Sequence, residues 1–360
     1  MQVFIFYSAA FSIKCSILNY LFFFALLICT PHTVSGTPDS LLYVKAKKEY
    51  LSKDYKEAQL ILNKINETTS NEDLIRERNL LRGKILYREK DYLAAAKLIE
   101  SIIKYNTEGL MINDKINYKN NKWLGYIYYS RGNNEKSIKR YKKALNILDH
   151  LNEENHINSV KIQTNISCSY SKLGMFSTAD IYFDQTLNYI KECLTKNDHS
   201  YYEEVLTEYG AHKIRADEYF QAEKKLKEAR FIYESKGDTL SKDYKYLIGK
   251  TATLYRVCKN YELALELYMK NYTSSKEIGP STNHSWNTRR VAYTHRLLNN
   301  LKASQKYYLE ALVFHQNREA VTRDQINITS EYANLLYQLG EKEKAISTQI
   351  HCLELSEKIY

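Results

Sequence analysis

The sequence predicts an all-α solenoid of about eight antiparallel helix pairs. Three observations predict it: a pattern of small and bulky residues that recurs about every 42 residues from Leu42 to Tyr360, a second small residue twelve positions before each copy, and an apolar content of 44%. A fixed period in this range is typical of stacked repeat units, because a single helix pair cannot bury its own apolar stripe.

The second helix of each pair is predicted from a small residue, a bulky residue four positions later, and usually a small or apolar residue after three more. These spacings place the three residues on one helix face. The eight copies begin, at steps of 37, 42, 42, 43, 42, 40 and 41 residues, with Ala58, Ala95, Ser137, Ala179, Ala222, Ala264, Ser304 and Ala345.

The first helix of each pair is predicted from the small residue twelve positions earlier, across a short turn. These residues are Ala46, Gly83, Gly125, Ser167, Gly210, Ala252, Ala292 and Ala333. Small residues in both helices let the two backbones approach closely. Six turns carry polar or flexible residues, at Lys53-Asp54, Lys90-Asp91, Gly132-Asn133, Gly174-Met175, Lys259-Asn260 and Gly340-Glu341. Gly, Asn and Asp tolerate the left-handed backbone that ends a helix.

The third and fourth copies resemble the tetratricopeptide repeat. The residues that carry the resemblance are Leu124, Gly125, Tyr128, Gly132, Tyr141 and Ala144, then Tyr170, Gly174, Phe176, Ala179 and Phe183. The resemblance extends over about 320 of the 360 residues. It implies a right-handed superhelix whose inner surface binds a protein or a peptide. The period exceeds the common 34 residues, as in the long repeats of kinesin light chains, and Pro280 is the only proline after Pro38.

The amino terminus is almost wholly apolar over residues 1–30, with Lys14 as its only charge. We expect residues 1–36 to be a secretory signal peptide, since Val34 and Gly36 suit a cleavage site. The alternative is an uncleaved anchor formed by residues 1–30, which are long enough to span a bilayer. Residues 37–360 are then a repeat domain outside the cytoplasm, in the periplasm or secreted, with membrane contact only through an uncleaved leader.

Four cysteines follow the leader, at Cys168, Cys193, Cys258 and Cys352, without a CxxC pair. Cys168 and Cys193 could pair in an oxidising compartment; the alternative is that both are free thiols at helix contacts. Five Asn-x-Ser/Thr sequons occur, at Asn66, Asn165, Asn271, Asn283 and Asn327.

No residue set indicates catalysis, a cofactor or a metal. The nine histidines are scattered without an HExxH pattern. Gly249-Lys250-Thr251 matches the end of a phosphate-binding loop, but the first glycine of that motif is replaced by Tyr244. We therefore expect a protein that is not an enzyme and that has no cofactor.

In each first helix, three positions are candidates for the inner surface: the residue three before the small residue, the residue one after it and the residue four after it. The eight first helices give 24 such positions. None is acidic, six are basic and seven are tyrosine. The thirteen candidate binding residues are Tyr43, Lys47, Tyr50, Lys84, Tyr87, Lys122, Tyr126, Tyr129, Arg256, Arg289, Tyr293, Arg296 and Tyr337. They predict a basic, tyrosine-lined groove for an acidic or aromatic peptide. The alternative is that the basic residues only solvate this face.

The partner is expected to be a protein or peptide and not nucleic acid, because the net charge of +10 is spread along all predicted helices. The last helix, Ala345–Tyr360, is apolar where a terminal repeat normally presents a polar face; we therefore expect possible self-association through it. The chain also resembles the extracytoplasmic part of bacterial membrane-bound tetratricopeptide regulators. A binding scaffold is the leading hypothesis, and a sensory part of a signalling system is the second.

Overall fold

The computed structural model describes residues 38–65, 71–107, 114–151, 156–193, 201–279, 281–316 and 321–358. Within these ranges the chain forms sixteen α-helices and no strand. The prediction of an all-α solenoid is confirmed. The chain divides into two compact units, residues 1–74 and 75–360, each of which is described by itself.

The first unit contains the first predicted helix pair, α2 (Pro38–Leu51) and α3 (Tyr55–Asn63). The predicted small residues Ala46 and Ala58 are fully buried. Asp54 caps α3, since its side chain accepts a hydrogen bond from the backbone N–H of Glu57. With nine residues α3 is much shorter than the other second helices, which accounts for the first step of 37 residues.

The second unit continues the array with long helices of 14 to 18 residues. They are α4 (Glu72–Arg88, whose first residues belong to the first unit), α5 (Tyr92–Thr107), α6 (Asp114–Ser130), α7 (Asn134–His150), α8 (His156–Lys172), α9 (Phe176–Cys193), α10 (Tyr202–Arg215), α11 (Tyr219–Ser235), α12 (Lys242–Val257), α13 (Tyr261–Ile278), α14 (Thr282–Leu297), α15 (Leu301–Gln316), α16 (Arg323–Gln338) and α17 (Lys342–Glu357). The long repeat therefore comes from both helices of each pair.

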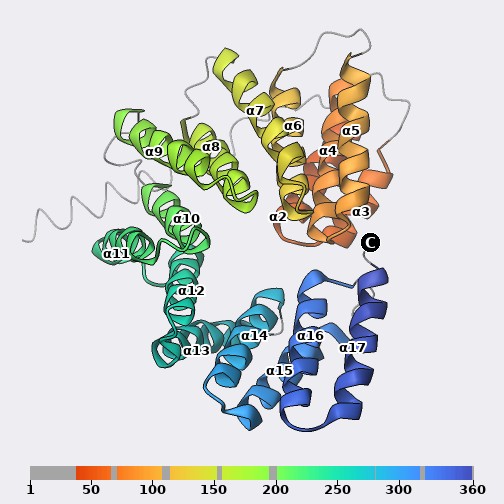
Figure 1. The fold of residues 1–360 in the computed structure, drawn as a ribbon. Helices are drawn as coiled ribbons and strands as arrows, with labels where there is room; N and C mark the ends of the chain where they lie inside the picture. The colour runs from red at the N-terminus through yellow and green to blue at the C-terminus, as the bar shows by residue number, and fades with distance from the viewer. Residues whose placement is uncertain are drawn as a thin grey trace, which may run out of the picture. The chain divides into compact units, whose positions relative to one another are not determined.

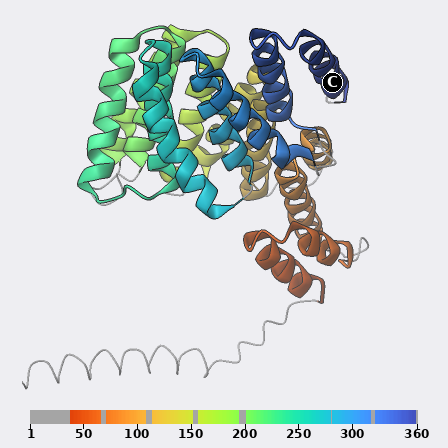
Figure 2. The ribbon, with the colours of Figure 1, turned by 90° about the horizontal axis from the view of Figure 1, so that it is seen from below.

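The helices of the second unit follow a curved path (Figure 1). The first helices of the pairs, with even numbers, lie on the inner side, and the second helices lie on the outer side. From α6 onward each helix packs against the next one in the chain. Figure 2 shows the green to teal helices packed side by side with similar axis directions.

The core of each pair is formed by the predicted pattern. In the third pair, Ser137, Tyr141 and Ala144 are buried on α7. An ideal Cβ atom on Gly125 of α6 would lie 2.4 Å from Cε1 of Tyr141. Only glycine therefore permits this approach of α6 to the tyrosine ring. In the last pair the bulky position is Gln349, which is exposed.

Every turn inside a helix pair has one residue with positive φ, and it always lies five positions before the small residue of the second helix. These residues are Lys53, Lys90, Gly132, Gly174, Asp217, Lys259, Asn299 and Gly340, with φ between 58° and 82°. At three of the eight positions the left-handed conformation is adopted by lysine, for which it is strained.

The curved path brings distant parts of the second unit together. At the start of α16, Nη2 of Arg323 donates a hydrogen bond to the carbonyl oxygen of Arg131, 3.2 Å away and 192 residues earlier. Arg131 lies in the turn between α6 and α7. The contact joins two repeats that are not adjacent in the array.

The four cysteines after the leader are free thiols. Cys168 is buried on α8, whereas Cys193 is exposed at the end of α9. A Cys168–Cys193 disulfide is therefore not formed. Cys168 instead donates to Oε2 of Glu208 at 3.5 Å.

The last helix, α17, keeps an exposed apolar stripe. Ile346, Ile350 and Leu353 have 62%, 53% and 57% of their surfaces exposed, while Ala345 and Leu355 are buried. Ile350 follows Ile346 by four positions and Leu353 follows Ile350 by three, so the three exposed side chains lie on one face of the helix. Self-association through this face stays a prediction.

The predicted leader, residues 1–36, lies outside the described residues, as do Asn66 and Pro280. Within the described ranges, no helix has the length and apolar character needed to cross a bilayer. The division into a leader and a repeat domain stays a prediction.

Candidate functional site

A cavity of about 250 Å³ opens between α12, α13, α14 and α16. Its lining contains three guanidinium groups, two phenols and one carboxylate: Arg256, Tyr268, Arg289, Arg290, Tyr293 and Glu331. Of the residues predicted from the sequence, Arg256, Arg289 and Tyr293 come together here. Arg290, Tyr268 and Glu331 were not among the candidates.

Arg289 is neutralised within the protein. Its Nε and Nη2 donate to the two carboxylate oxygens of Glu331, at 3.0 and 2.6 Å, and its Nη1 lies 3.4 Å from Oδ1 of Asp324. Burial raises the pKa of Asp324, although the Arg289 guanidinium acts against this rise. The ion pairs tie α14 to α16, so Arg289 stabilises the stacking of adjacent repeats.

Arg290 has a different environment. Its guanidinium carbon lies 3.6 Å from the ring centroid of Trp286, and its Nη1 donates to Oγ1 of Thr253 at 2.7 Å and to the hydroxyl of Tyr268 at 3.1 Å. Burial lowers the pKa of Arg290, and repulsion from Arg256 contributes. From the described part of the chain, no carboxylate pairs with this guanidinium.

Tyr293 lies between two cations. The guanidinium carbon of Arg256 is 5.4 Å from its ring centroid, and that of Arg296 is 5.0 Å away. Cation–π attraction fixes both side chains along the inner side of α12 and α14. The candidates Arg256, Tyr293 and Arg296 therefore form one contact group beside the cavity.

A second polar group lies further along the inner side, on α8, α10 and α12. Oε1 of Glu208 accepts from the Tyr246 hydroxyl at 2.7 Å, and Oε2 accepts from Cys168. The Lys250 ammonium lies 4.5 Å from the ring centroid of Tyr246. Burial lowers the pKa of Lys250, and repulsion from Arg290 adds to this effect.

The candidate Tyr129 borders this second group from α6. The ammonium of Lys172 lies 3.3 Å from the Tyr129 ring centroid. Burial lowers the pKa of Lys172 to about 8, and repulsion from Arg215 contributes. The second group therefore places the cations Lys172 and Lys250 near the carboxylate of Glu208.

A family model described as "Tetratricopeptide repeat" matches residues 117–192. Tetratricopeptide repeats are therefore present. The match spans α6 to α9, which contain the third and fourth copies of the sequence pattern. It confirms the family that those copies resemble.

Solved structures share the fold of the tetratricopeptide array at low sequence identity. A Rap protein complexed with Competence and Sporulation Factor aligns with a TM-score of 0.55 and 13% identity, over 89% of this chain and 98% of that one. BtubC (BKLC) from P. vanneervenii aligns with a TM-score of 0.54 and 15% identity, over 63% and 92%.

A tetratricopeptide repeat protein from Parabacteroides merdae ATCC 43184 has a TM-score of 0.54 and 16% identity, over 81% of this chain and 98% of that one. At these identities the similarity shows the fold. No curated protein matches the sequence significantly.

On α4 and α6, the candidates form an aromatic series. Tyr87 packs edge-on against Trp123, and Trp123 contacts Tyr126, with ring centroids 5.6 and 5.7 Å apart. Lys84 lies 5.3 Å from the Trp123 centroid. The series continues to Tyr141 of α7, whose ring packs edge-on against Tyr126 at 5.5 Å, so these candidates contribute to helix packing.

Lys122 on α6 is held by neighbouring polar groups. Its ammonium donates to the Tyr118 hydroxyl at 3.0 Å and to Oδ1 of Asn158 at 3.1 Å. Burial lowers its pKa to about 8, with repulsion from Lys161 contributing. This lysine is therefore a partly buried cation without a carboxylate partner in the described ranges.

The remaining candidates lie elsewhere. Tyr43, Lys47 and Tyr50 are on α2 of the first unit, where Tyr50 packs against Tyr55 at 5.6 Å. Tyr337, at the end of α16, is 65% exposed. The cavity described above includes none of these four residues.

Four of the residues missed by sequence reasoning share a position, whereas the missed Tyr268 lies on a second helix, α13. Glu208, Lys250, Arg290 and Glu331 all lie two residues before the small residue of their first helix, a position outside the 24 that were considered. Several inner contacts also join residues about one repeat apart, such as Arg289 and Glu331, which are 42 residues apart. A search for opposite charges at this separation would have found that pair.

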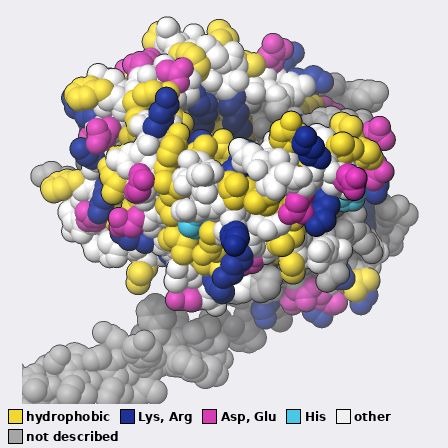
Figure 3. Space-filling view, turned by 60° about the horizontal axis from the view of Figure 1, so that its bottom comes forward, with side chains coloured by type: hydrophobic (Ala, Val, Ile, Leu, Met, Phe, Trp, Pro, Cys, Tyr) yellow, Lys and Arg dark blue, Asp and Glu magenta, His cyan; other side chains and the backbone are white. Residues whose placement is uncertain are grey.

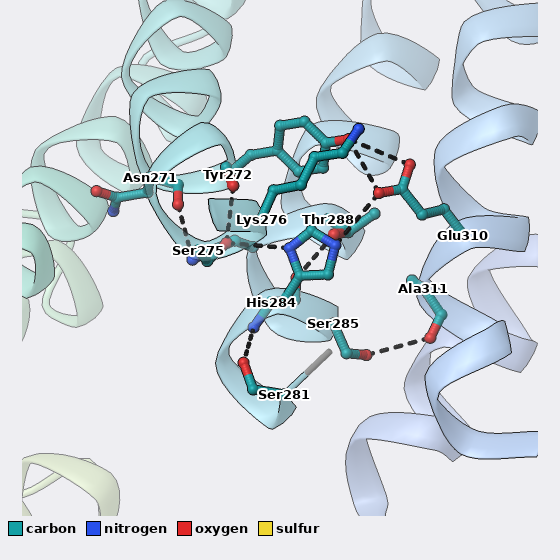
Figure 4. A network of polar contacts seen from close by, with 11 residues as sticks. Asn271, Tyr272, Ser275, Lys276, Ser281, His284, Ser285, Thr288, Glu310 and Ala311 are labelled. Atoms are coloured by element: carbon teal, nitrogen blue, oxygen red, sulfur yellow. Dashed lines mark hydrogen bonds and ion pairs between the residues drawn. The ribbon is translucent and has the colours of Figure 1, made fainter. Parts of the chain in front are cut away.

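A polar network with Ser, His and Glu lies between α13, α14 and α15 (Figure 4). His284 contacts Oγ of Ser275 through Nδ1 and Oε1 of Glu310 through Nε2, both at 3.2 Å. Ser275 is buried and donates its own hydroxyl proton to the carbonyl of Tyr272. The two ring nitrogens of His284 therefore join Ser275 of α13 to Glu310 of α15 through hydrogen bonds.

Within the described ranges, no group of three or more His, Cys, Asp or Glu residues is arranged to hold a metal ion. Figure 3 shows basic, acidic and apolar side chains interspersed on one face of the molecule. Positive charge is not gathered into one broad patch on that face.

Proposed function

We propose that the protein is a non-enzymatic scaffold that binds a protein or an extended peptide along the inner side of its repeats. The observation that carries the proposal is the cavity lined by Arg256, Arg290 and Tyr293 on the inner helices. Repeat arrays commonly bind partners on such extended concave surfaces. The Rap protein with the same fold was solved in complex with Competence and Sporulation Factor, which also supports a binding role.

The chemistry of the inner side supports binding over catalysis. Arginine and tyrosine are the residue types that anchor protein partners, because they combine large contact areas with directed polar groups. The Ser275–His284–Glu310 network has the residue types of a hydrolase, but its serine is buried and its hydrogen bonds join α13, α14 and α15.

Photo-crosslinking in the native compartment tests this function. A photoreactive p-benzoylphenylalanine in place of Tyr293 samples the cavity, and the same residue in place of Phe231 samples the outer helix α11, where Phe231 is exposed. We expect a discrete crosslinked product, identified by mass spectrometry, from the inner position and not from the outer one. Equal labelling from both positions would contradict binding on the inner side.

We also propose that the repeats work outside the cytoplasm. The support is the apolar leader pattern of residues 1–36 and the small residues at Val34 to Gly36. Cell fractionation and the amino-terminal sequence of the mature protein test this location. A protein that keeps Met1 and fractionates with the cytosol would contradict it.

A further inference from the structure

Five cations on the first helices α8, α10, α12 and α14 form what we call the inner cationic row: Lys172, Arg215, Lys250, Arg256 and Arg290. None of them makes an ion pair with a carboxylate in the described parts of the chain. Arg215 donates to Oγ of Ser171 at 2.7 Å, and the others contact aromatic rings.

The cations of the row lie close enough to repel one another. Lys172 is repelled by Arg215 and Lys250, Lys250 by Arg290 and Arg215, and Arg290 by Arg256. Glu208 attracts both Lys172 and Lys250, and its two oxygens also accept from Tyr246 and Cys168, so one carboxylate acts on two cations of the row. Like charges held close together in a partly buried site are stabilised by an anionic ligand.

Arg290 presents a defined binding edge. Its Nη1 hydrogens are used by Thr253 and Tyr268, while Nε and Nη2 have no acceptor among the described residues. Stacking on Trp286 fixes the plane of the guanidinium. In the adjacent Arg289 the same two nitrogens hold a carboxylate, that of Glu331. The equivalent edge of Arg290 therefore has the geometry for a bidentate carboxylate.

The aromatic rings along the row favour a peptide over a nucleic acid. Arg290 covers Trp286, Lys250 covers Tyr246, and Arg256 and Arg296 flank Tyr293. Nucleic-acid grooves instead use free aromatic faces on which bases stack. Here the rings orient the cations, which leaves the cations as the groups that would contact a peptide.

We propose that the inner cationic row binds an acidic polypeptide segment, with one carboxylate on the Nε and Nη2 edge of Arg290 and another beside Lys250. The proposal rests on the binding function proposed above and specifies the chemistry of the partner. It requires at least two carboxylates in an extended segment, because the row crosses several repeats.

Fluorescence anisotropy with a labelled, amino-capped deca-glutamate peptide tests the proposal. The double variant Lys250→Gln/Arg290→Gln removes two charges from the row. The matched control Lys227→Gln/Lys270→Gln removes two charges from the outer helices α11 and α13, where both lysines pair with glutamates four residues earlier. We expect the row variant to weaken binding about tenfold or more and the control about twofold or less.

Circular dichroism of both variants checks that the helices are retained. The single variant Arg290→Lys keeps the charge but loses the bidentate edge. It gives a second measurement if the double variant unfolds, with weakened binding expected at unchanged melting temperature. Equal loss in the row variant and the control, or equal binding of a deca-glutamine peptide, would overturn the proposal.

Two further ligands identify the source of the carboxylates. The first is deca-glutamate with an amidated carboxyl terminus. It binds as well as the free peptide if the protein binds side-chain carboxylates, and more weakly if the protein binds the terminal carboxylate. A single-stranded oligonucleotide that binds as tightly as deca-glutamate would overturn the peptide assignment. A partner crosslinked from Tyr293, together with no binding of deca-glutamate, would reject this inference and leave the proposed function standing.

Discussion

The ideal Cβ position of Gly125 lies 2.4 Å from Cε1 of Tyr141, closer than any real Cβ contact. Tyr141 is fully buried, so its ring has no free space into which it can move. The distance between α6 and α7 is therefore set by the missing side chain at residue 125. Gly83 and Gly210 have the same relation to Ile99 and Leu226.

Gly125→Ala should destabilise the fold by about 2 kcal/mol, because overpacking against Tyr141 outweighs the gain of about 1 kcal/mol in helix propensity. The free energy of urea unfolding measures the change. Adding Tyr141→Leu to Gly125→Ala makes room for the methyl group. The double variant should therefore be less destabilised than the sum of the two single variants, and simple additivity would contradict the steric explanation.

Lys259→Gly should stabilise the fold by about 0.5–1 kcal/mol, since it removes a side chain from a backbone with φ of 63°. Gly174→Ala at the equivalent turn should destabilise by about 1 kcal/mol. The ideal Cβ of Gly174 meets no atom within 4 Å, so this variant isolates backbone strain. Thermal unfolding of both variants checks the opposite signs; changes of the same sign would show that the turn register does not govern stability.

Lys122→Met should flatten the pH dependence of stability above neutral pH. Burial lowers the folded-state pKa of Lys122 to about 8, below its usual 10.5. Between these values the unfolded chain binds more protons than the folded chain, so stability rises with pH. The midpoint of urea unfolding at several pH values from 7 to about 10 measures this slope.

The Lys122→Met slope should be smaller than that of the native protein, with Lys172 supplying part of the remainder, since its pKa is also lowered to about 8. Lys227→Met, at an exposed site paired with Glu223, should retain the native slope over the same range. Equal slopes in the native protein and in Lys122→Met would contradict the assignment.

His284→Phe should destabilise the fold by about 2–3 kcal/mol, because Glu310 and Ser275 each lose a hydrogen-bond partner. Denaturant unfolding of His284→Phe, Glu310→Leu and the double variant forms a cycle. We expect the double variant to be more stable than the sum of the single losses implies, because removing both partners leaves no unpaired carboxylate. Additive losses would mean that the two side chains are energetically independent.

The repeating fold could be predicted because it depends on local spacing. Residues such as Ala95 and Ser137 mark helix faces, and turn residues such as Gly132 mark helix ends. These signals lie within one repeat, so no knowledge of the superhelix was needed. The turn at Lys259 was placed correctly, but its left-handed residue was not predicted: that conformation was expected of Gly, Asn or Asp, whereas Lys259 adopts it and Asn260 caps α13 with φ of −87°.

The candidate site was only partly predictable, because its contacts run between repeats. Whether Arg289 is free or paired depends on the twist that brings Glu331 beside it, 42 residues later. Arg290 is adjacent in sequence to Arg289, yet its plane is set by Trp286 and Tyr268 on two different helices. The three inner positions chosen per repeat excluded Arg290. Sequence periodicity therefore predicted residues beside the cavity but did not predict Arg290 itself.

The hydrogen bond from Arg323 to Arg131 gives the array a mechanical property. An open solenoid lengthens like a spring when it is pulled, because each repeat holds only its neighbours. Here one hydrogen bond joins residues 192 positions apart. It must break before the helices between Arg131 and Arg323 can move apart. Extension of the second unit would therefore break this contact in addition to the contacts between adjacent repeats.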